Sequence, residues 1–432
     1  MAELSVFALV PFVLMLAGIA VCPLILPQWW EKNTNKIIYS LLLALPTMLY
    51  LTLRGCSSEV LHQMFYDYLP FIVLVGTLFV VTGGINIKLN MRPTPMVNSL
   101  LLVVGFLLAS LMGTTGAALL LVRPLLEINR ERRYKAHLVL FFIALVANCG
   151  GLLTPLGDPP LFMLFLRGVP FEWFLKLFPM WLFAGGALLF LYFLSDIFYY
   201  NKEQGGFKAS VRENDGAVIT CSGARNFIYL LLVVLTVAFV NKGSFSFMAD
   251  EKAPLYVDFL REIVLLAIAA VSWLTTDSKV RAANSFSWAP LNEVVVLFFG
   301  VFATMTPALL FLQSLTGEIG INTPAEFYYA TGSLSSFLDN TPTAVAFHAL
   351  AIRFSEGCTD IVGGVREGYL VAVSLGAVFF GSMTYIGNGP NFMVKAIAER
   401  RGVKMPGFIA YILLFSLPVL LPIFILVQLL FL

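Results

Sequence analysis

A short polar stretch occurs twice in this chain, each time inside apolar sequence long enough to cross a membrane. The first copy covers residues 154–160 (TPLGDPP) and the second covers residues 384–391 (TYIGNGPN). A lipid bilayer cannot hydrogen-bond to an exposed backbone, so an unwound stretch at membrane depth is stable only where protein or a water-lined cavity satisfies it. Because the two breaks lie at matching places in the two halves of the chain, they predict a transport site near the bilayer midplane.

The composition predicts an all-α membrane protein. Of the 432 residues, 59% are hydrophobic and only 12% are charged, and many apolar runs reach the roughly 20 residues that a spanning helix requires. The chain begins with no basic residue before the first apolar run, so we expect no cleaved signal peptide and assign that run to the first membrane helix. The five cysteines are scattered without the spacing of metal ligands.

The hydropathy pattern predicts ten membrane crossings. Two of them, 137–166 and 367–398, are broken by the polar stretches described above. The other eight are plain apolar runs, at 4–27, 37–53, 68–86, 173–195, 225–241, 258–276, 293–312 and 407–432.

Two further stretches, 97–126 and 326–352, are apolar on both arms and polar in the middle. The polar middles are residues 113–116 (GTTG) and 338–342 (LDNTP). An arm such as 97–109 covers only about 20 Å at 1.5 Å per residue, which is too short to cross. These stretches therefore predict re-entrant hairpins, which enter and leave the membrane on one side.

The distribution of basic residues supports the first hairpin and gives a topology. Lys88 and Arg92 precede this hairpin and a basic cluster at 130–135 follows it, so both of its ends have the character of cytoplasmic loops. Alternating through ten crossings from that assignment places most of the 27 Lys and Arg residues inside and both termini outside.

Each half of the chain then has three plain helices, a hairpin, a broken helix and a last helix. Because five crossings is an odd number, the two halves must be inverted relative to one another. We therefore predict a first inverted repeat at 1–200, a cytoplasmic linker at 201–224 and a second inverted repeat at 225–432.

Two carboxylates lie in these polar stretches. Asp158 is in the gap of the first broken helix, and Asp339 is at the turn of the second hairpin. An ionised Asp inside a membrane is costly and usually faces a cavity that serves an ion or a proton pathway. The alternative is that each Asp caps the N-terminus of a half-helix, which Pro159 and Pro160 favour for Asp158. One residue can do both.

Neutral polar residues occupy related positions in the two halves. Asn388 holds the place of Asp158, and Thr114 and Thr115 roughly hold the places of Asn340 and Thr341. Carboxylate, hydroxyl and amide oxygens are the hard ligands that a small cation such as sodium prefers. We therefore predict a site for protons and sodium, with the metal held at Asp158, Asp339, Asn340 and Asn388 and with Thr114, Thr115 and Thr341 beside it.

Six other polar residues have two interpretations each. For Thr154, Thr384, Asn148 and Asn391, direct ion ligation and satisfaction of the broken backbone are equally consistent with the sequence. Arg123 and Lys395 lie within apolar segments, where either could bind an anionic substrate or pair with a carboxylate; the alternative is that their side chains extend to the membrane interface, which we favour for Lys395.

Three segments resemble the signatures of a known family: residues 148–160 (NCGGLLTPLGDPP), 335–343 (SSFLDNTPT) and 383–391 (MTYIGNGPN). They are similar to the ion transporter superfamily, in particular its branch of NhaD-like sodium/proton antiporters and citrate transporters. The resemblance covers about residues 66–200 and 290–400. It implies an inverted-repeat fold, a homodimer built on a scaffold domain, and elevator-like movement of a transport domain.

The resemblance also bears on the substrate. Relatives that carry dicarboxylates with sodium have a Ser-Asn-Thr triplet at each hairpin tip. Here the triplets are Gly-Thr-Thr at 113–115 and Asp-Asn-Thr at 339–341. This departure adds a carboxylate and favours cations over dicarboxylates.

We therefore predict sodium/proton antiport across a bacterial inner membrane, with the two ions competing for one carboxylate-containing site. The alternative is sodium-coupled uptake of an organic anion such as citrate or a dicarboxylate, held by half-helix N-termini and a basic residue. No nucleophile and base pairing or phosphate-binding loop stands out in the sequence, so we predict neither an enzyme nor a bound cofactor other than the transported sodium. The expected partners are the lipid bilayer and a second copy of the chain, not nucleic acid.

Overall fold

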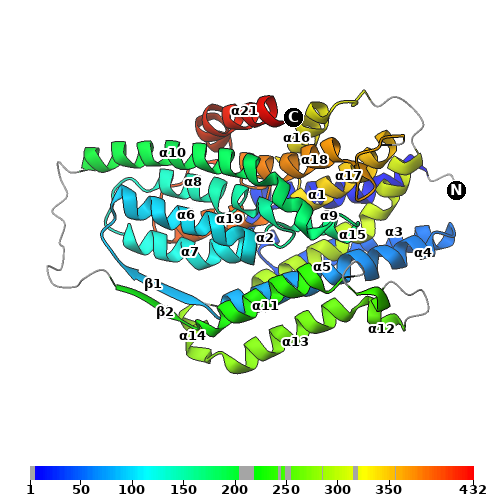
Figure 1. The fold of residues 1–432 in the computed structure, drawn as a ribbon, viewed down its shortest axis with the longest axis horizontal. Coiled ribbons are helices and arrows are strands. Elements are labelled where there is room, and N and C mark those ends of the chain that lie inside the picture. Colours follow the sequence, from blue (N-terminus) through cyan, green and yellow to red (C-terminus); the bar gives the residue numbers. More distant parts are fainter. Residues whose placement is uncertain are drawn as a thin grey trace.

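The computed structural model describes residues 5–203, 218–241, 245–248, 254–284, 286–314, 320–355 and 357–432. Its helices run mainly along the long axis of the molecule, with the strands β1 and β2 near one end and the short helices α4 and α12 near the other (Figure 1). Within the described residues, eight helical stretches are long and apolar enough to cross a membrane. The protein is therefore a multi-pass, mainly helical membrane protein.

Two groups of three long helices pack against one another, and we call them the scaffold helices. The first half contributes α1 (Val10–Ile25), α3 (Asn33–Leu53) and the continuous helical stretch of α4 (Ser57–His62), the π-helical η2 (Gln63–Tyr68) and α5 (Leu69–Gly83). The second half contributes α11 (Arg225–Phe239), α13 (Leu260–Thr275) and α15 (Ala289–Ser314). Helices α1 and α3 pack on α15, while α11 and α13 pack on α5, so each pair packs on a helix of the other half.

The first hairpin consists of α6 (Pro95–Met112) and α7 (Thr114–Ile128), which pack side by side. They are joined at Gly113, whose φ of 80° lies in the left-handed region that glycine enters without strain. Thr94 caps the start of α6 by accepting a hydrogen bond from the Val97 amide. The α6 arm is longer than predicted, because its 18 residues span about 27 Å and it is one of the eight helices of spanning length.

The second hairpin consists of α16 (Pro324–Ser335) and α17 (Asn340–Phe354). Its start is fixed by a capping box in which Thr323 and Glu326 each accept a hydrogen bond from the other's backbone amide. Each hairpin therefore begins at a threonine that caps its first helix and is followed by proline.

Two helices are interrupted where the polar stretches lie. The first is α8 (Ala136–Leu145), the 3₁₀ turn η3 (Cys149–Leu153) and α9 (Pro159–Leu166); the second is α18 (Glu367–Phe380), the 3₁₀ turn η6 (Gly381–Met383) and α19 (Gly389–Arg400). Pro159 and Pro390 lie in the first turn of α9 and α19, where the missing amide hydrogen costs no hydrogen bond.

The hairpins and broken helices form one buried unit, which we call the core bundle (α6–α9 and α16–α19). Helix α7 of the first hairpin packs on α19, and α17 of the second hairpin packs on α9, so each hairpin contacts the broken helix of the other half. Helix α10 (Phe178–Glu203), which follows the 3₁₀ turn η4 (Phe171–Leu177), packs on α6 and α8. The last helical stretch is α20 (Phe408–Tyr411), the π-helical η7 (Ile412–Leu420) and α21 (Leu421–Phe431).

The predicted linker at 201–224 is not wholly irregular. Residues 204–217 lie outside the described residues, but β2 (Val218–Ser222) pairs antiparallel with β1 (Asn86–Asn90), with Asn86 opposite Ser222. The strand forms here because β1 follows α5, β2 precedes α11, and these two helices pack together. A second ribbon joins β3 (Ile361–Val362) to β4 (Val365–Arg366). The short helices are α2 (Pro27–Trp30), α12 (Leu255–Asp258) and α14 (Ser278–Ala283), with the 3₁₀ turns η1 (Val6–Leu9) and η5 (Ser246–Met248).

Candidate ion site

Asp158 lies at the centre of the core bundle, where only 1% of its surface is exposed. Its Oδ1 accepts hydrogen bonds from Thr114 Oγ1 at 2.8 Å and from Asn388 Nδ2 at 3.3 Å. Its Oδ2 accepts a hydrogen bond from Asn340 Nδ2 at 3.0 Å. Thr114 and Asn340 begin α7 and α17, and Asp158 and Asn388 precede α9 and α19. Both hairpin tips and both helix gaps therefore meet at one carboxylate.

The geometry separates the two interpretations of the acidic residues. Asp158 precedes α9, but its side chain makes no capping hydrogen bond to that helix and contacts the two hairpins and the other gap instead. The Asp339 carboxylate does cap its helix, because its Oδ1 accepts a hydrogen bond from the Thr341 amide at 3.1 Å. Capping thus describes Asp339, whereas the Asp158 carboxylate is held by side chains from both halves.

The Asp158 carboxylate has neutral donors only. Within the described residues, no Lys, Arg or His forms an ion pair with it. Asp339 directly precedes Asn340, whose amide donates to the Asp158 carboxylate. An ionised carboxylate in a medium of low polarity is strongly disfavoured without a compensating charge. The site is therefore suited to a carboxylate that carries a proton or holds a cation.

Three asparagines form a hydrogen-bonded chain behind Asp158. Asn388 Nδ2 also donates to the Ala147 carbonyl and to Asn148 Oδ1, each at 3.1 Å. Asn148 Nδ2 donates to Asn391 Oδ1 at 2.7 Å. Asn391 Nδ2 in turn donates to the backbone carbonyls of Gly381 at 2.8 Å and Thr384 at 2.9 Å. Asn148 and Asn391 therefore satisfy the broken backbone and fix the amide of Asn388.

The two gap threonines have the same role in the two halves. Thr154 Oγ1 donates to the Ser110 carbonyl of the first hairpin, and Thr384 Oγ1 donates to the Ser336 carbonyl of the second at 2.5 Å. Each threonine also accepts a hydrogen bond from the amide two residues later, at 3.2 Å in both halves. These contacts tie each gap to its own hairpin through the backbone, and neither hydroxyl reaches the Asp158 carboxylate.

Serines next to the hairpin turns complete the site, and the sequence analysis did not select them. Ser335 Oγ lies 2.7 Å from both Asn340 Oδ1 and the Ala377 carbonyl, so its single hydroxyl hydrogen is shared between these two acceptors and links α18 to the amide that faces Asp158. Ser110 Oγ donates to the Gly150 carbonyl at 2.5 Å. Their position could have identified them, because Ser110 lies four residues before Thr114 and Ser335 lies five residues before Asn340, and Thr114 and Asn340 begin the returning arms of the hairpins.

A cavity of about 110 Å³ lies between the hairpin tips and the scaffold helices, and we call it the inner cavity. Residues 113–116, Asp339 and Asn388 line its polar side, and Phe71 and Phe298 belong to its apolar side. Thr115 is half-buried and lines the cavity, and within the described structure it forms no hydrogen bond with Asp158. The hydroxyl of Thr341 is buried and has no hydrogen-bond partner within the described structure.

Arg123 and Lys395 lie away from the carboxylate site. Arg123 Nη1 donates to the backbone carbonyl of Asn284, in the loop between α14 and α15. Lys395 forms an ion pair with Glu399 at 2.9 Å, one turn later in the same helix. Among the described residues, neither contacts Asp158; the pairing of Lys395 with a carboxylate is one of its two predicted interpretations, and a role of either cation in substrate binding stays a prediction.

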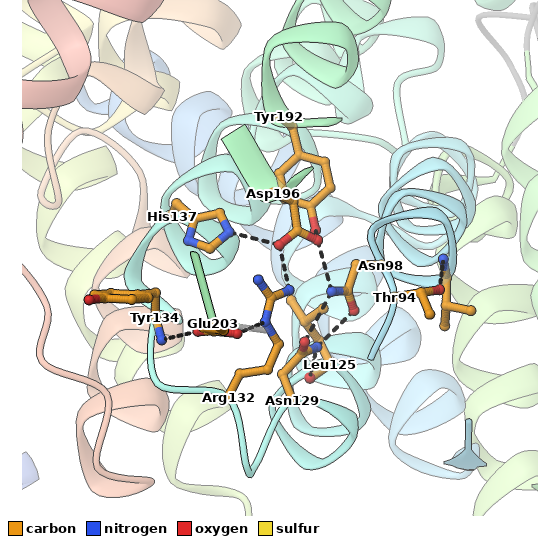
Figure 2. Close-up of polar contacts among 11 residues, drawn as sticks. Thr94, Asn98, Leu125, Asn129, Arg132, Tyr134, His137, Tyr192, Asp196 and Glu203 are labelled. Atoms are coloured by element: carbon orange, nitrogen blue, oxygen red, sulfur yellow. Dashed lines mark hydrogen bonds and ion pairs between the residues drawn. The ribbon is translucent and has the colours of Figure 1, made fainter. Parts of the chain in front are cut away.

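A second polar cluster lies between the first hairpin and α10 (Figure 2), and the sequence analysis missed it. Asp196 is fully buried and forms an ion pair with Arg132. It also accepts hydrogen bonds from His137 Nε2 at 2.9 Å, Asn98 Nδ2 at 3.0 Å and the Tyr192 hydroxyl at 3.2 Å. Arg132 belongs to the basic cluster at 130–135, which is predicted to be cytoplasmic, and it is only 2% exposed because α10 continues past the predicted end of its crossing at 195.

Arg132 also joins the end of α10. Its Nε bonds to Glu203 Oε2 at 3.1 Å, and Glu203 Oε1 accepts the Tyr134 amide at 2.6 Å. Asn98 and Asn129 exchange hydrogen bonds of 3.0 and 2.8 Å at the base of the hairpin. We call the set of Asn98, Asn129, Arg132, His137, Tyr192, Asp196 and Glu203 the hairpin-base cluster.

The whole chain was also compared with known proteins. A family model described as "Putative citrate transport" matches residues 1–432. No protein of curated function matches the chain. The match covers the whole chain, including all the scaffold helices, whereas the motif resemblance covers about residues 66–200 and 290–400.

Proposed function

The chain belongs to the family described as "Putative citrate transport", and from that membership and the geometry at Asp158 we propose that it is a secondary transporter that exchanges sodium for protons. The observation that carries this proposal is the buried Asp158 carboxylate, which accepts three hydrogen bonds from neutral side chains. The NhaD-like antiporters are the relatives whose activity this arrangement fits.

Exchange follows from the chemistry of a single carboxylate. When Asp158 is ionised, the cost of its buried charge is offset by a bound sodium; when sodium leaves, a proton takes its place. The unpartnered Thr341 hydroxyl and the cap residue Asp339, which lines the inner cavity, supply further oxygens nearby. Because the site holds either ion but not both, moving it between the two sides of the membrane exchanges one for the other.

The matched contacts of the two halves support an inverted repeat. The pair Thr154–Ser110 in the first half corresponds to Thr384–Ser336 in the second. We propose that residues 1–200 and 225–432 are inverted five-crossing repeats, and that the core bundle moves against the scaffold helices as an elevator. A homodimer in a bacterial inner membrane with both termini outside completes the proposal.

A second candidate function is sodium-coupled uptake of an organic anion. Two observations favour it: the description of the family names citrate, and the N-termini of α7 and α19 line the inner cavity through Thr114 and Gly389. Helix N-termini carry partial positive charge and attract carboxylates. Under this function, Asp158 holds the coupling sodium while the cavity holds the anion.

Proton flux in proteoliposomes separates the two functions. Purified protein is reconstituted with an acidic lumen that contains a pH-sensitive dye, and sodium, potassium or citrate is added outside. Antiport predicts that sodium alone makes the lumen alkaline and that citrate is not required. Lumenal alkalinisation or sodium uptake only when citrate is present would support the symport and overturn the antiport.

The Asp339→Asn variant tests whether the second carboxylate takes part. Asn is as good a helix cap as Asp, so the variant keeps the start of α17 while it removes the negative charge. If Asp339 holds an exchanged ion, the sodium-driven proton flux should fall with no loss of folded protein. Normal exchange would limit Asp339 to its capping role and leave Asp158 as the exchanging group.

A further inference from the structure

A second and larger cavity, of about 1360 Å³, lies toward the end of the molecule that carries α4 and α12 (Figure 1). We call it the vestibule. Its walls come from α4 and η2, from residues 238–241 at the end of α11, from the start of α13, and from residues 165–172 after α9. It therefore lies between the scaffold helices and the core bundle, at the end opposite the β1–β2 ribbon.

The vestibule has an acidic lining. Two basic side chains, Arg167 and Arg261, are among the described residues that line it. Arg167 forms an ion pair with Asp67 at 3.1 Å, and Arg261 forms one with Glu262 at 2.5 Å. Each guanidinium therefore has a carboxylate beside it. Among the described residues that line this space, carboxylates outnumber guanidinium groups five to two, with His62 beside them; the carboxylates are those of Glu59, Asp67, Glu172, Asp258 and Glu262.

Glu262 gives a second, independent indication of a cation in this space. It lines the vestibule and is only 3% exposed. Its Oε1 accepts from both Nε and Nη2 of Arg261, at 2.8 and 2.5 Å. Its Oε2 is buried and has no hydrogen-bond partner within the described structure. A carboxylate oxygen in that position is an open acceptor that only water or a cation can satisfy.

An aromatic wall separates the vestibule from the inner cavity. Phe162 lines the inner cavity and Phe165, one turn later in α9, lines the vestibule. The Arg261 guanidinium lies over both rings, at 5.7 and 5.5 Å from their centroids. The rings of Phe71 and Phe298, whose centroids are 4.7 Å apart, pack together in the lining of the inner cavity. The vestibule thus ends close to the Asp158 site but does not open into it.

We propose that the vestibule is an antechamber for cations, whose acidic lining concentrates sodium and repels organic anions on this side of the membrane. A recess lined by one sign of charge between walls of low polarity focuses its field, and it can raise the local concentration of counter-ions by about 10- to 1000-fold. The inference deepens the proposed function, because the cation collected here would be the one that Asp158 exchanges.

Charged thiol reagents measure the potential of the vestibule directly, without any need for transport. In a variant whose five native cysteines are replaced by serine or alanine, Ala238→Cys places one thiol in the vestibule lining. The rates of modification by a cationic trimethylammonium and an anionic sulfonate methanethiosulfonate are compared, each divided by its rate with a free thiol. The cationic reagent should be favoured by about tenfold or more at low salt, and the preference should fall as salt is added.

Two exposed acids supply the matched variants. Glu59→Gln and Glu172→Gln together should reduce the cationic preference several-fold, because both line the vestibule. Asp360→Asn is the control, since Asp360 is an exposed acid paired with Arg366 outside the vestibule. Equal modification rates for the two reagents, or an equal change in the control, would overturn the antechamber.

Sodium transport gives the second readout. With sodium supplied on the vestibule side, the Glu59→Gln/Glu172→Gln variant should show a several-fold higher apparent KM for sodium and an unchanged maximal rate. The two proposals fail separately: an antiporter whose vestibule shows no cationic preference overturns only the antechamber. A protein with the cationic preference but no sodium-driven proton flux overturns only the antiport.

Discussion

Two fully buried carboxylates in this protein are stabilised in different ways. Asp196, in the hairpin-base cluster, is paired with the guanidinium of Arg132 and accepts further hydrogen bonds from three side chains (Figure 2). Asp158, at the hairpin tips, accepts three hydrogen bonds from hydroxyl and amide groups, and within the described residues it has no basic partner.

This difference distinguishes a carboxylate that stabilises the fold from one that can bind a transported ion. Burying an ion costs several kcal/mol, which an opposite charge with good geometry offsets. At Asp196 the protein supplies that charge from Arg132, which also pairs with Glu203. At Asp158 the described protein supplies only dipoles, so the charge balance depends on a proton or a metal ion. We infer that the first cluster fixes the fold and the second carries the transport.

The origin of the partners differs as well. The side chains around Asp196 all come from the first half, between Asn98 and Glu203, so they hold the first hairpin against α10. Those around Asp158 come from both halves, because Thr114 belongs to the first and Asn388 to the second. A site shared between the halves responds to any movement of one half against the other, whereas the hairpin-base cluster does not.

The largest effect should come from Asp158→Asn. Asn has the shape of Asp but cannot hold a charge-balancing cation or exchange a proton, so sodium-driven proton flux in proteoliposomes should drop to the level of liposomes without protein. The thermal unfolding temperature should stay the same or rise, because the variant removes a buried uncompensated charge. Sodium/proton exchange at the normal rate would show that Asp158 does not take part in the mechanism. The contrast between Asp158 and Asp196 would then say nothing about transport.

Arg132→Gln should give the next largest effect, and on stability. Removing one partner of a buried ion pair leaves the other charge uncompensated, which costs about 3–5 kcal/mol. The free energy of unfolding in detergent should fall by that amount, while the flux per folded molecule should change little.

The double variant Arg132→Gln/Asp196→Asn sharpens this test. It removes the uncompensated charge as well, so it should regain part of the lost stability, and the difference from additivity measures the pair. A loss as large in the double variant as the sum of the two single losses would show that Arg132 acts through its packing and not through Asp196.

Sodium should stabilise the site at the tips and leave the hairpin-base cluster unaffected. A ligand at 100 times its Kd stabilises the folded state by about 2.7 kcal/mol. Native protein and Arg132→Gln should therefore show the same sodium-dependent rise in unfolding temperature, and Asp158→Asn should show none. A sodium-dependent rise that survives in Asp158→Asn would place the bound cation elsewhere in the protein.

The smallest effect should come from Thr114→Val, which removes one of the three hydrogen bonds to the Asp158 carboxylate. A hydrogen bond to a charged group contributes about 1.5–3 kcal/mol, so the apparent affinity for sodium should fall roughly 10- to 100-fold. Ser374→Ala is the control, because Ser374 is buried in α18 and within the described structure its hydroxyl donates to the carbonyl one turn earlier and not to the Asp158 site. An equal shift in both variants would mean that general packing, not the carboxylate, is affected.

Much of the fold could be predicted because its causes are local. Single prolines such as Pro46 and Pro307 are accommodated inside long helices, but Pro, Gly, Thr and Asn or Asp grouped within a few residues interrupt a helix, so the gaps at 154–158 and 384–388 could be predicted from the residues. The turn at Gly113 also has a local cause, since the left-handed backbone there favours glycine. Apolar runs of sufficient length indicated membrane helices for the same reason, although the α6 arm proved longer than the sequence suggested.

The parts that could not be predicted depend on partners distant in the sequence. Asp196 lay one residue beyond a predicted crossing, and nothing near it indicated that Arg132 and His137 would surround it. Likewise, nothing in the sequence near Arg123 indicated that its guanidinium would donate to the carbonyl of Asn284. In each case one partner lies in a loop, Arg132 between α7 and α8 and Asn284 between α14 and α15, so the tertiary packing of the helices around that loop decides which groups meet.

The sequence by itself determined that this is a multi-pass membrane protein with helices broken at two places, because the bilayer demands long apolar runs and glycine, proline and asparagine end helices locally. It left ion binding and helix capping open for both Asp158 and Asp339, and Pro159 and Pro160 favoured capping for Asp158. Only the tertiary structure decided between them. Asp339 turns back to cap its own helix, whereas Asp158 is held by donors from the opposite half, because the interlocked hairpins bring those groups within hydrogen-bonding distance of its carboxylate alone.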